Sequence, residues 1–548
     1  MRIALSQLNF IIGDFQQNTE KMLQQIQRAL AERADLIVFP ELSVCAYPPR
    51  DFLEFNDFIQ HCQKAAETIA AACNGITAIV GLPSVNPLPE GKNLYNAAYV
   101  LRDGKVVDRV YKALLPTYDI FDEYRYFEPN RSFHCIEING EKIALTICED
   151  LWNIDEDPLY VTCPMEELHR EQPALMINIA ASPFDYSHAD ERKAVLKKNV
   201  SKYNLPLLYV NHVGAQTEII FDGGSLALDK SGRVVTELDY FREDFRMVTF
   251  EKGNLVADIA QQPSTTTAEK YSCIHDALVL GIRDYFTKQG FKKAILGLSG
   301  GIDSAVVTYL AATALGAQNV KVLLMPSPFS SSGSVDDSLA LVKNLGVESE
   351  IIPIKSIYDT FIETLSPAFK DLPFNVTEEN LQARARGVLL MAQSNKFGAI
   401  LLNTTNKSEL AVGYGTLYGD MCGGISVIGD VYKTEVYELV KFINRNSEII
   451  PHNIIAKAPS AELRPGQKDS DSLPEYDVLD PLLFQYVEKR KGPDELIAMG
   501  FQEELVHRVL KMVNTNEYKR HQTPPILRVS PKAFGSGRRL PIVGRYLS

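Results

Sequence analysis

Short apolar runs alternate with amphipathic segments through the first half of the chain. Apolar side chains recur at helical spacing over residues 18–34, and this period predicts a helix with one buried face. The apolar runs are typical of strands, which we predict at residues 2–8, 36–39, 77–81, 97–101, 143–148, 175–179 and 207–212. Asp103-Gly104 in AAYVLRDGKVVDRVYK and Ser231-Gly232 in ALDKSGRVVTEL each predict a hairpin turn. This mixture predicts an α/β layered sandwich.

A polar stretch, QQPSTTT at residues 261–267, interrupts these patterns, and we interpret residues 256–270 as a linker. Beyond it, helical patterns alternate with apolar runs at residues 294–298, 320–325, 349–354 and 399–402. That alternation predicts a doubly wound parallel sheet, which binds ligands at the carboxyl ends of its strands. The sequence therefore predicts one domain at residues 1–255 and another at residues 271–548.

Composition narrows the class of protein. The 548 residues are too many for one core, and the 45% hydrophobic and 23% charged content is that of a soluble globular protein. MRIALSQLNFIIGDF does not read as a secretory signal, and no apolar stretch approaches the roughly 20 residues that span a bilayer. The eight cysteines form no CxxC pair, which argues against a zinc site or a disulfide framework. We expect a cytoplasmic protein without a membrane partner.

Charge excludes a general nucleic-acid binder, since the formal net charge is −13. The exception is the basic tail, residues 518–548, which carries no acidic residue. Its basic residues are Lys519, Arg520, Arg528, Lys532, Arg538, Arg539 and Arg545. Composition alone leaves two alternatives open, a solvated disordered tail and an ordered segment that includes Pro524, Pro525 and Phe534.

Three stretches at predicted strand ends carry reactive residues: FPE with Glu41, VYK with Lys112 and ICED with Cys148. Singly, they could be a helix cap, a surface charge and a buried filler. Together, Cys148 would be a nucleophile whose thiolate a nearby ammonium favours, and Glu41 the general base. Lys112 would stabilise the tetrahedral oxyanion, with the backbone N–H after Cys148 as a second donor.

This Glu-Lys-Cys order resembles the nitrilase superfamily of carbon–nitrogen hydrolases, over most of residues 1–250. The resemblance implies an αββα sandwich and amide hydrolysis with release of ammonia. Glu123 matches by context the further glutamate that supports the lysine, and we group it with the substrate site. Tyr118 and Ser182 fall where relatives hold the amide substrate, so the implied glutamine-binding residues are Tyr118, Ser182 and Glu123.

The second predicted domain holds SGGIDS directly after a predicted strand and before a helical pattern. It lacks the lysine of the GxxxxGK[ST] loop, but its N–H groups and hydroxyls can bind an oxyanion at a helix N-terminus. Asp303 would be unfavourable beside phosphate unless Mg²⁺ lies between them. The alternative is an ordinary glycine turn capped by Ser and Asp. SGGxDS resembles the pyrophosphate loop of the N-type ATP pyrophosphatases, which adenylate an acceptor.

Three further stretches, residues 375–391, 401–437 and 458–474, resemble NAD synthetase. The resemblance implies a Mg²⁺ site at Asp303 and Glu409, although Glu409 could instead be a first-turn helix residue. The implied ATP-binding residues are Gly297, Ser299, Gly300, Gly301, Asp303, Ser304, Arg384, Arg386, Thr404 and Thr405. The implied residues for nicotinic acid adenine dinucleotide are Asp420, Lys433 and Lys519. Which of Arg384 and Arg386 contacts ATP is left open, since Arg384 could form a surface pair.

As a whole the chain resembles the glutamine-dependent NAD synthetases. The resemblance implies that ammonia from glutamine amidates adenylated nicotinic acid adenine dinucleotide, giving NAD, AMP, pyrophosphate and glutamate. It also implies a homo-oligomer, an ammonia tunnel and an ordered C-terminal tail. Asparagine synthetase differs because its glutaminase needs an N-terminal cysteine, whereas this sequence opens Met1-Arg2. GMP synthetase differs because its GxCxG elbow is missing, and a decayed binding protein is disfavoured by the intact reactive residues.

Overall fold

The computed structural model describes residues 1–257, 269–330, 332–370 and 372–546. The chain divides into two compact units, Met1–Ala268 (unit 1) and Glu269–Ser548 (unit 2). Most of the predicted linker, residues 258–268, lies outside the described residues. No helix in the described ranges is both long enough and apolar enough to cross a bilayer.

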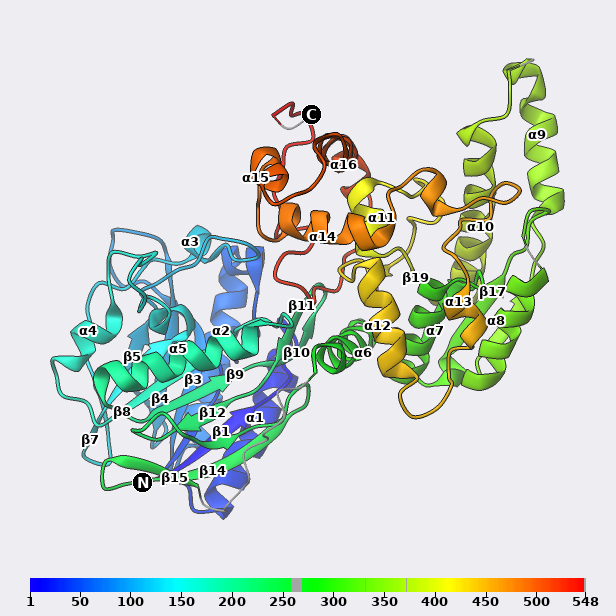
Figure 1. Cartoon of the computed structure of the whole chain (residues 1–548). Helices are drawn as coiled ribbons and strands as arrows, with labels where there is room; N and C mark the ends of the chain where they lie inside the picture. Colours follow the sequence, from blue (N-terminus) through cyan, green and yellow to red (C-terminus); the bar gives the residue numbers. More distant parts are fainter. Residues whose placement is uncertain (258–268, 331, 371, 547–548) are drawn as a thin grey trace. The chain divides into compact units, whose positions relative to one another are not determined.

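Unit 1 contains two large sheets (Figure 1). The first has the order β15-β14-β1-β2-β3-β4-β5: Asn254–Ala257, Asp244–Glu251, Arg2–Gln7, Leu36–Val38, Thr77–Val85, Leu94–Arg102 and Lys105–Tyr111. The second has the order β13-β12-β9-β8-β7-β6: Val234–Glu237, Leu226–Leu228, Leu207–Asn211, Leu175–Ala180, Glu141–Ile147 and Ile136–Ile138. A separate hairpin joins β10 (Val213–Gln216) to β11 (Ile219–Asp222).

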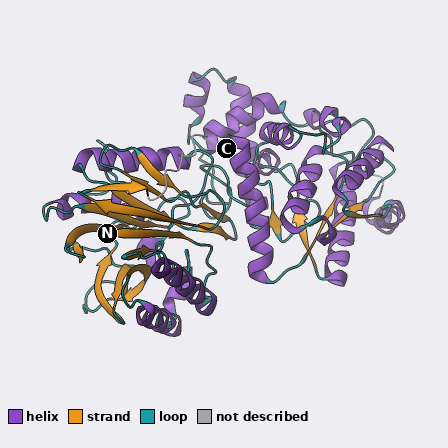
Figure 2. Ribbon diagram, turned by 90° about the horizontal axis from the view of Figure 1, so that it is seen from below, coloured by secondary structure: helices purple, strands orange, loops and turns teal. Residues whose placement is uncertain are grey.

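Side-chain alternation along β1 shows why the sheets form layers. Ile3 and Leu5 point into the core between the two sheets, whereas Ala4 points into a second core with Met22 and Ile26 of a helix. The helices of unit 1 are α1 (Phe15–Ala31), α2 (Asn56–Ala72), α3 (Glu123–Tyr126), α4 (Pro164–His169) and α5 (His188–Tyr203), with 3₁₀ turns η1 (Arg50–Glu54) and η2 (Cys148–Leu151). Helices cover both outer faces of the paired sheets (Figure 2). The predicted αββα sandwich is confirmed.

The predicted hairpin at Asp103-Gly104 is the β4–β5 turn, with both residues in the left-handed region (φ 50° and 76°). The second predicted hairpin joins β12 to β13 antiparallel around Ser231-Gly232, with a register irregularity at Ala227 and Leu228. Both turns place a residue with positive φ where the sequence offers Asp-Gly or Ser-Gly, as tight hairpins require.

Unit 2 is built on a parallel sheet of order β18-β17-β16-β19-β20, which confirms the doubly wound prediction. Its strands are β16 (Lys293–Gly297), β17 (Val320–Leu324), β18 (Glu348–Ile351), β19 (Ala399–Asn403) and β20 (Ile425–Ser426). Strand order reverses at β16, whose neighbours are β17 and β19. This is the switch point at which such sheets bind ligands beyond the strand ends.

Helices and 3₁₀ turns supply the rest of unit 2. They are α6 (Lys270–Gln289), α7 (Ile302–Leu315), η3 (Ala317–Asn319), α8 (Ser332–Leu345), α9 (Lys355–Phe369), α10 (Val376–Phe397), α11 (Lys407–Val412), α12 (Lys433–Ile443), α13 (His452–Ala456), η4 (Asp469–Asp471), α14 (Tyr476–Val487), α15 (Pro493–Ala498), α16 (Glu503–Thr515) and α17 (Glu517–Arg520). The first part of the basic tail is packed into this unit, because Arg520 is buried and donates to the carbonyls of Leu410 and Ala411. Arg538 pairs with Glu517 at 2.6 Å.

Candidate active sites

Cys148 lies where β7 ends and the η2 turn begins, and its backbone has a left-handed φ of 46°. A non-glycine residue in that region carries strain of about 1–3 kcal/mol, which the surrounding structure must hold. Such a strand-to-turn elbow projects a nucleophile away from its sheet, with the next backbone N–H beside it. The geometry fits the nucleophile that ICED predicts.

Lys112 joins two of the acidic residues predicted from the sequence. Its Nζ donates to Glu41 Oε1 and to Glu123 Oε1, each at 2.8 Å. All three side chains are buried, and Tyr47 adds a hydrogen bond from its hydroxyl to Glu123 at 2.9 Å. Burial alone would lower the pKa of Lys112, but the charges of Glu123 and Glu41 raise it well above its ordinary value, so Lys112 is an ammonium.

The pKa of the Cys148 thiol differs from the one that the sequence predicts. Lys112 lowers its pKa as expected, but burial and the charge of Glu41 act more strongly in the opposite direction. The pKa of Cys148 is therefore raised well above the ordinary thiol value, and the resting residue is a neutral thiol. A base must remove its proton, which makes Glu41 more important than the ammonium alone would suggest.

Asp150 joins the two catalytic segments, although the sequence did not single it out. Its Oδ1 accepts the backbone N–H groups of Ala113 and Leu114 at 3.0 and 2.9 Å, and Oδ2 accepts that of Ile147 at 3.1 Å. Burial raises the pKa of Asp150 to about 6. One buried carboxylate thus ties the chain after Lys112 to the end of the strand that carries the nucleophile.

Apart from Glu123, the predicted glutamine-binding residues Tyr118 and Ser182 take part in two separate sets of hydrogen bonds. Tyr118 donates to the carboxylate of Glu149 at 2.9 and 3.1 Å, and Tyr160 donates to the same carboxylate at 3.1 Å. Ser182 Oγ lies 2.9 Å from His188 Nε2. Glu149 and Tyr160 were missed in the sequence; the position of Glu149 directly after Cys148 was the available signal.

Glu123 gives a testable pH dependence. Burial, aided by the charge of Glu41, raises its pKa to about 7 despite the attraction of Lys112. Below that pH the carboxyl of Glu123 is protonated, so Lys112 loses the attraction of one of the two carboxylates that hold its Nζ and is positioned less firmly. We expect glutamate release from glutamine to fall as the pH drops through about 7. Glu123→Gln, fixed in the neutral form, should lose about 10²-fold in kcat and no longer show this step. A step of unchanged size and position in Glu123→Gln would contradict the assignment.

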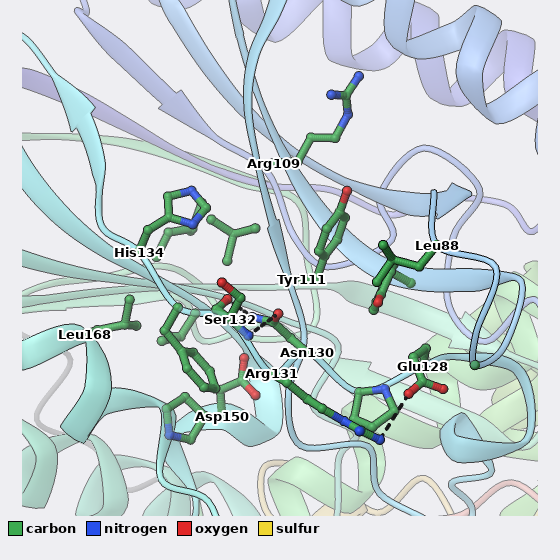
Figure 3. Close-up of a pocket in the computed structure, with 18 of the residues that line it drawn as sticks. Leu88, Arg109, Tyr111, Glu128, Asn130, Arg131, Ser132, His134, Asp150 and Leu168 are labelled. Carbon is green, nitrogen blue, oxygen red and sulfur yellow. Dashed lines mark hydrogen bonds and ion pairs between the residues drawn. The ribbon is translucent and has the colours of Figure 1, made fainter. Parts of the chain in front are cut away.

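A cavity of about 460 Å³ in unit 1 lies apart from the predicted catalytic residues, none of which lines it (Figure 3). Its polar side chains bind one another: Arg131 pairs with Glu128 at 3.3 Å, and Asn130 accepts the N–H of Ser132 at 3.0 Å. Asp150 also lines this cavity and connects its wall to the backbone of the catalytic segments. The catalytic cluster itself is formed without it.

In unit 2 a cavity of about 650 Å³ lies at the switch point beside β16, at the carboxyl ends of the strands as predicted. The predicted residues that line it are Gly297, Ser299, Gly301, Asp303, Ser304, Arg386, Thr404, Thr405, Glu409, Asp420, Lys433 and Lys519. Gly300 and Arg384 are the two predicted unit 2 residues outside this lining. Of these two candidate arginines, Arg386 lines the cavity, with its Nε on the carbonyl of Met325 at 3.0 Å, whereas Arg384 binds the carbonyl of Leu417 at 3.2 Å.

The SGGIDS loop is held by its own hydroxyls. Ser304 Oγ donates to the carbonyl of Gly301 at 3.0 Å and accepts the N–H of Ser299 at 3.2 Å. Ser299 Oγ accepts the N–H of Gly301 at 3.2 Å. The loop leads into α7, so N–H groups and the positive end of a helix dipole meet at the cavity.

Gly300 is required by the shape of the loop. Its φ is +80°, and a Cβ there would lie 2.5 Å from the carbonyl oxygen of Ser334. We expect Gly300→Ala to raise the KM for ATP and to cost about 1–3 kcal/mol of stability. Gly301→Ala is the matched control for stability, because its Cβ would meet only Ser299 Oγ at 3.3 Å. Thermal unfolding should separate the two variants, and equal midpoints would contradict this account.

Asp303 and Glu409 converge on one cation, the ammonium of Lys433. Lys433 donates to Asp303 and lies 3.8 Å from Glu409 Oε1, while Asn406 donates to Asp303 Oδ1 at 3.1 Å. Burial and the charge of Asp303 raise the pKa of Glu409 to about 8. Two partly buried carboxylates around a single ammonium make a site that favours positive charge.

Asp420 and Lys519, predicted for the dinucleotide, also face this cavity. Asp420 accepts the backbone N–H of Thr416 at 2.6 Å, and Lys519 donates to the carbonyls of Gly413 and Gly415 at 2.8 and 2.9 Å. Desolvation within the cavity raises the pKa of Asp420, which keeps an exposed surface, and lowers that of the half-buried Lys519. Both are therefore partly desolvated polar groups on the wall of the cavity.

Comparison with known proteins matches each unit to a protein family. The family described as carbon-nitrogen hydrolase matches residues 2–260, and the family described as NAD synthase matches residues 274–523. A glutamine-dependent NAD(+) synthetase of Synechocystis sp. is 44% identical over 550 residues, which cover 98% of this chain and 98% of that protein. This chain belongs to the glutamine-dependent NAD(+) synthetase family.

Other members of the glutamine-dependent NAD(+) synthetase family agree with this placement. The Thermotoga maritima member is 40% identical, with 100% of this chain and 99% of that protein covered. A solved structure of the Acinetobacter baumannii member, in complex with adenosine diphosphate, has a TM-score of 0.78 and 38% identity over 99% of this chain and 98% of that one. The family predicted from the motifs in the two halves is confirmed.

Proposed function

We propose that this protein is a glutamine-hydrolysing NAD synthetase. Unit 1 releases ammonia from glutamine, and unit 2 uses it to convert nicotinic acid adenine dinucleotide to NAD while ATP becomes AMP and pyrophosphate. The observation that carries the proposal is that one chain holds both the Glu41–Lys112–Cys148 constellation and a cavity lined by the SGGIDS loop. Full-length similarity to glutamine-dependent NAD(+) synthetases supports it.

In unit 1, Glu41 removes the proton of the neutral Cys148 thiol, and the thiolate attacks the amide carbon of glutamine. The Lys112 ammonium and the N–H of Glu149 stabilise the oxyanion, and Glu41 gives the proton taken from the thiol to the departing nitrogen, which leaves as ammonia. Glu41 then activates the water that hydrolyses the thioester to glutamate. The Lys112–Glu41 distance of 2.8 Å supports this division of roles, because the base and the oxyanion donor are held together.

Glu149 would make unit 1 selective for glutamine. Glu149 is buried beside Cys148, and the hydroxyls of Tyr118 and Tyr160 hold its carboxylate. We assign it to the α-ammonium group of glutamine, since that charge would satisfy a carboxylate which otherwise has only neutral donors. Ser182, with His188, lies in the same predicted substrate region.

In unit 2, the carboxylate of the dinucleotide attacks the α-phosphorus of ATP, and pyrophosphate leaves against the N–H groups of the SGGIDS loop. Ammonia then attacks the carbonyl carbon of the adenylate and displaces AMP. Arg386, Thr404 and Thr405 line the cavity in which we place ATP. Asp420, Lys433 and Lys519 line the part that we assign to the dinucleotide.

The donor set also fits magnesium. Among the residues that the structure describes, no cluster of three or more metal-ligating His, Cys, Asp or Glu side chains occurs. Two carboxylates are the set expected where Mg²⁺ takes its remaining ligands from water and substrate phosphates. Asp303 and Glu409, which already converge on the Lys433 ammonium, would hold it. Bound there, Mg²⁺ would neutralise charge on the departing pyrophosphate.

A direct test supplies the purified protein with ATP, MgCl₂ and nicotinic acid adenine dinucleotide, and then with either glutamine or an ammonium salt. We expect NAD from both nitrogen sources, with AMP and pyrophosphate formed in equal amounts to NAD. Formation of ADP in place of AMP, or no NAD from either source, would refute the proposal. Omitting MgCl₂ tests the assigned carboxylate pair.

The remaining expectations concern location and assembly. All eight cysteines are free thiols, which suits a reducing compartment, and we propose the cytoplasm. The family resemblance supports a homo-oligomer, which sedimentation of the full chain would measure. No nucleic-acid partner is expected, given the net charge of −13.

A further inference from the structure

Asn96 on β4 contacts three residues of the glutaminase site. Its side-chain amide donates to Glu41 Oε1 at 2.7 Å and to Glu123 Oε2 at 3.2 Å. Its backbone carbonyl accepts the N–H of Lys112 at 2.8 Å. The residue is fully buried, with 0% of its surface exposed. Asn96 therefore connects Glu41 and Glu123 through its neutral side chain, and the backbone of Lys112 through its own backbone carbonyl.

The orientation of this amide follows from its neighbours. Turned the other way, Asn96 would direct its carbonyl oxygen at two carboxylates, which is repulsive. In the observed orientation both N–H groups are used, while Oδ1 has no hydrogen-bond partner. Leaving a buried acceptor unpaired is unfavourable, so the two bonds to carboxylates determine how the side chain sits.

Charge explains why an amide suits the position. The titratable groups that face Asn96 or act on its partners are Glu41, Glu123, Lys112, Tyr47, Cys148, Glu149, Asp150 and His212, whose Nε2 lies on the Glu41 carbonyl. The ammonium of Lys112 bonds directly to both Glu41 and Glu123. An aspartate in place of Asn96 would add a further acid to the cluster, and an apolar residue would remove both donors.

We propose that Asn96 is a positioning residue for glutamine hydrolysis, which keeps Glu41 and Glu123 correctly aimed by donating one hydrogen bond to each carboxylate. The inference rests on the glutaminase activity proposed for unit 1. It assigns Asn96 no contact with glutamine. Its effect should therefore appear in turnover and in the pH profile, and the affinity for glutamine should change little.

The test compares Asn96→Leu and Asn96→Asp, which both remove the amide donors. Aspartate keeps the shape of asparagine and adds a carboxyl group, whereas leucine is larger and adds no charge. For both we expect kcat for glutamate release to fall about 10- to 100-fold, as for other buried supporting groups, with KM for glutamine nearly unchanged. The acid limb of the kcat profile should move up by about one pH unit in Asn96→Leu, because a hydrogen bond to each carboxylate is lost. Asn96→Asp should move it further.

Two controls separate positioning from loss of folding. Asn18 is also buried, and its side chain donates to the carbonyls of Ile11 and Val44 at 2.8 and 3.2 Å, so Asn18→Leu should lower thermal stability without moving the acid limb. NAD formation from ammonia, which occurs in unit 2, should be unchanged in every variant. If NAD formation from ammonia remained in every variant but even the wild-type protein released no glutamate from glutamine, the proposed glutaminase function would fail, and the inference about Asn96 would fail with it.

The inference is overturned if Asn96→Leu keeps the wild-type acid limb, even with a reduced kcat. It is also overturned if Asn18→Leu shifts the limb to the same extent, since any buried amide would then suffice. A rise in KM for glutamine with kcat unchanged would place Asn96 in substrate binding and would likewise contradict the proposal.

Discussion

Cys148→Ala should abolish NAD formation from glutamine and leave NAD formation from ammonia intact. The thiol is the only group at the β7 elbow that can form the thioester, and losing a catalytic nucleophile typically costs on the order of 10⁴- to 10⁶-fold in rate. The ammonia-dependent reaction is assigned to unit 2, which supplies the described lining of the cavity from Gly297 to Lys519. NAD should be measured with each nitrogen source at saturating ATP and dinucleotide.

Cys62→Ala is the matched control for Cys148→Ala. Cys62 is equally buried in unit 1 but lies on α2, and its removal should leave both reactions close to wild type. Loss of both reactions in Cys148→Ala would mean that the two units do not divide the work as proposed. Retention of glutamine-dependent synthesis would remove Cys148 from the mechanism.

Asp303→Ala should abolish NAD formation from both nitrogen sources. The variant removes one of the two carboxylates that converge on Lys433, next to the loop assigned to pyrophosphate. Removing a group that stabilises transition-state charge costs on the order of 10²- to 10³-fold or more. Glutamate release should continue, because the residues proposed for it, Glu41, Lys112 and Cys148, belong to unit 1, whereas Asp303 belongs to unit 2.

Asp284→Ala is the control for Asp303→Ala. Asp284 is a buried carboxylate of the same unit, paired with Lys288 at 3.2 Å, and it does not line the cavity. It should lose stability but keep NAD formation. Thermal unfolding of both variants shows whether folding is affected, and a folded Asp303→Ala enzyme that still makes NAD from ammonia would contradict the assignment.

The reactive residues that could be predicted from the sequence lie in short, contiguous motifs at strand ends. Glu41, Lys112 and Cys148 each follow an apolar run, so strand prediction and residue chemistry pointed to the same positions. SGGIDS likewise follows β16 and leads into α7. In unit 2 the order of the parallel strands places the SGGIDS loop at the switch point. In unit 1, Glu41 and Lys112 follow β2 and β5 of one sheet and Cys148 follows β7 of the other, so the packing of the two sheets brings them together.

The supporting residues could not be predicted in this way. Asn96 lies inside a strand pattern, and Asp150 reads as a helix cap after the nucleophile. Their roles depend on hydrogen bonds to residues 55 and 37 positions away in the chain, which no local pattern contains. Strand β14 was also missed, because its pairing with β1 spans almost the whole of unit 1.

The sequence also could not show how far burial removes water from a side chain and so shifts its pKa. A neighbouring ammonium suggested an acidic thiol at Cys148, but burial and Glu41 reverse the balance. The sequence likewise could not decide between Arg384 and Arg386. They lie two positions apart on α10, and Arg386 lines the cavity whereas Arg384 does not. Such differences follow from how completely a side chain is enclosed.

The resting protonation state of Cys148 has a consequence for inhibitor chemistry. General alkylating reagents react with thiolates, so they should modify Cys148 slowly, and the partly exposed Cys163 and Cys273 would compete for them. A glutamine-shaped electrophile would differ, because on binding it would meet a sulfur that Glu41 is placed to deprotonate. Selective covalent inhibition of this enzyme therefore depends on a warhead of modest intrinsic reactivity, carried by a scaffold that imitates glutamine.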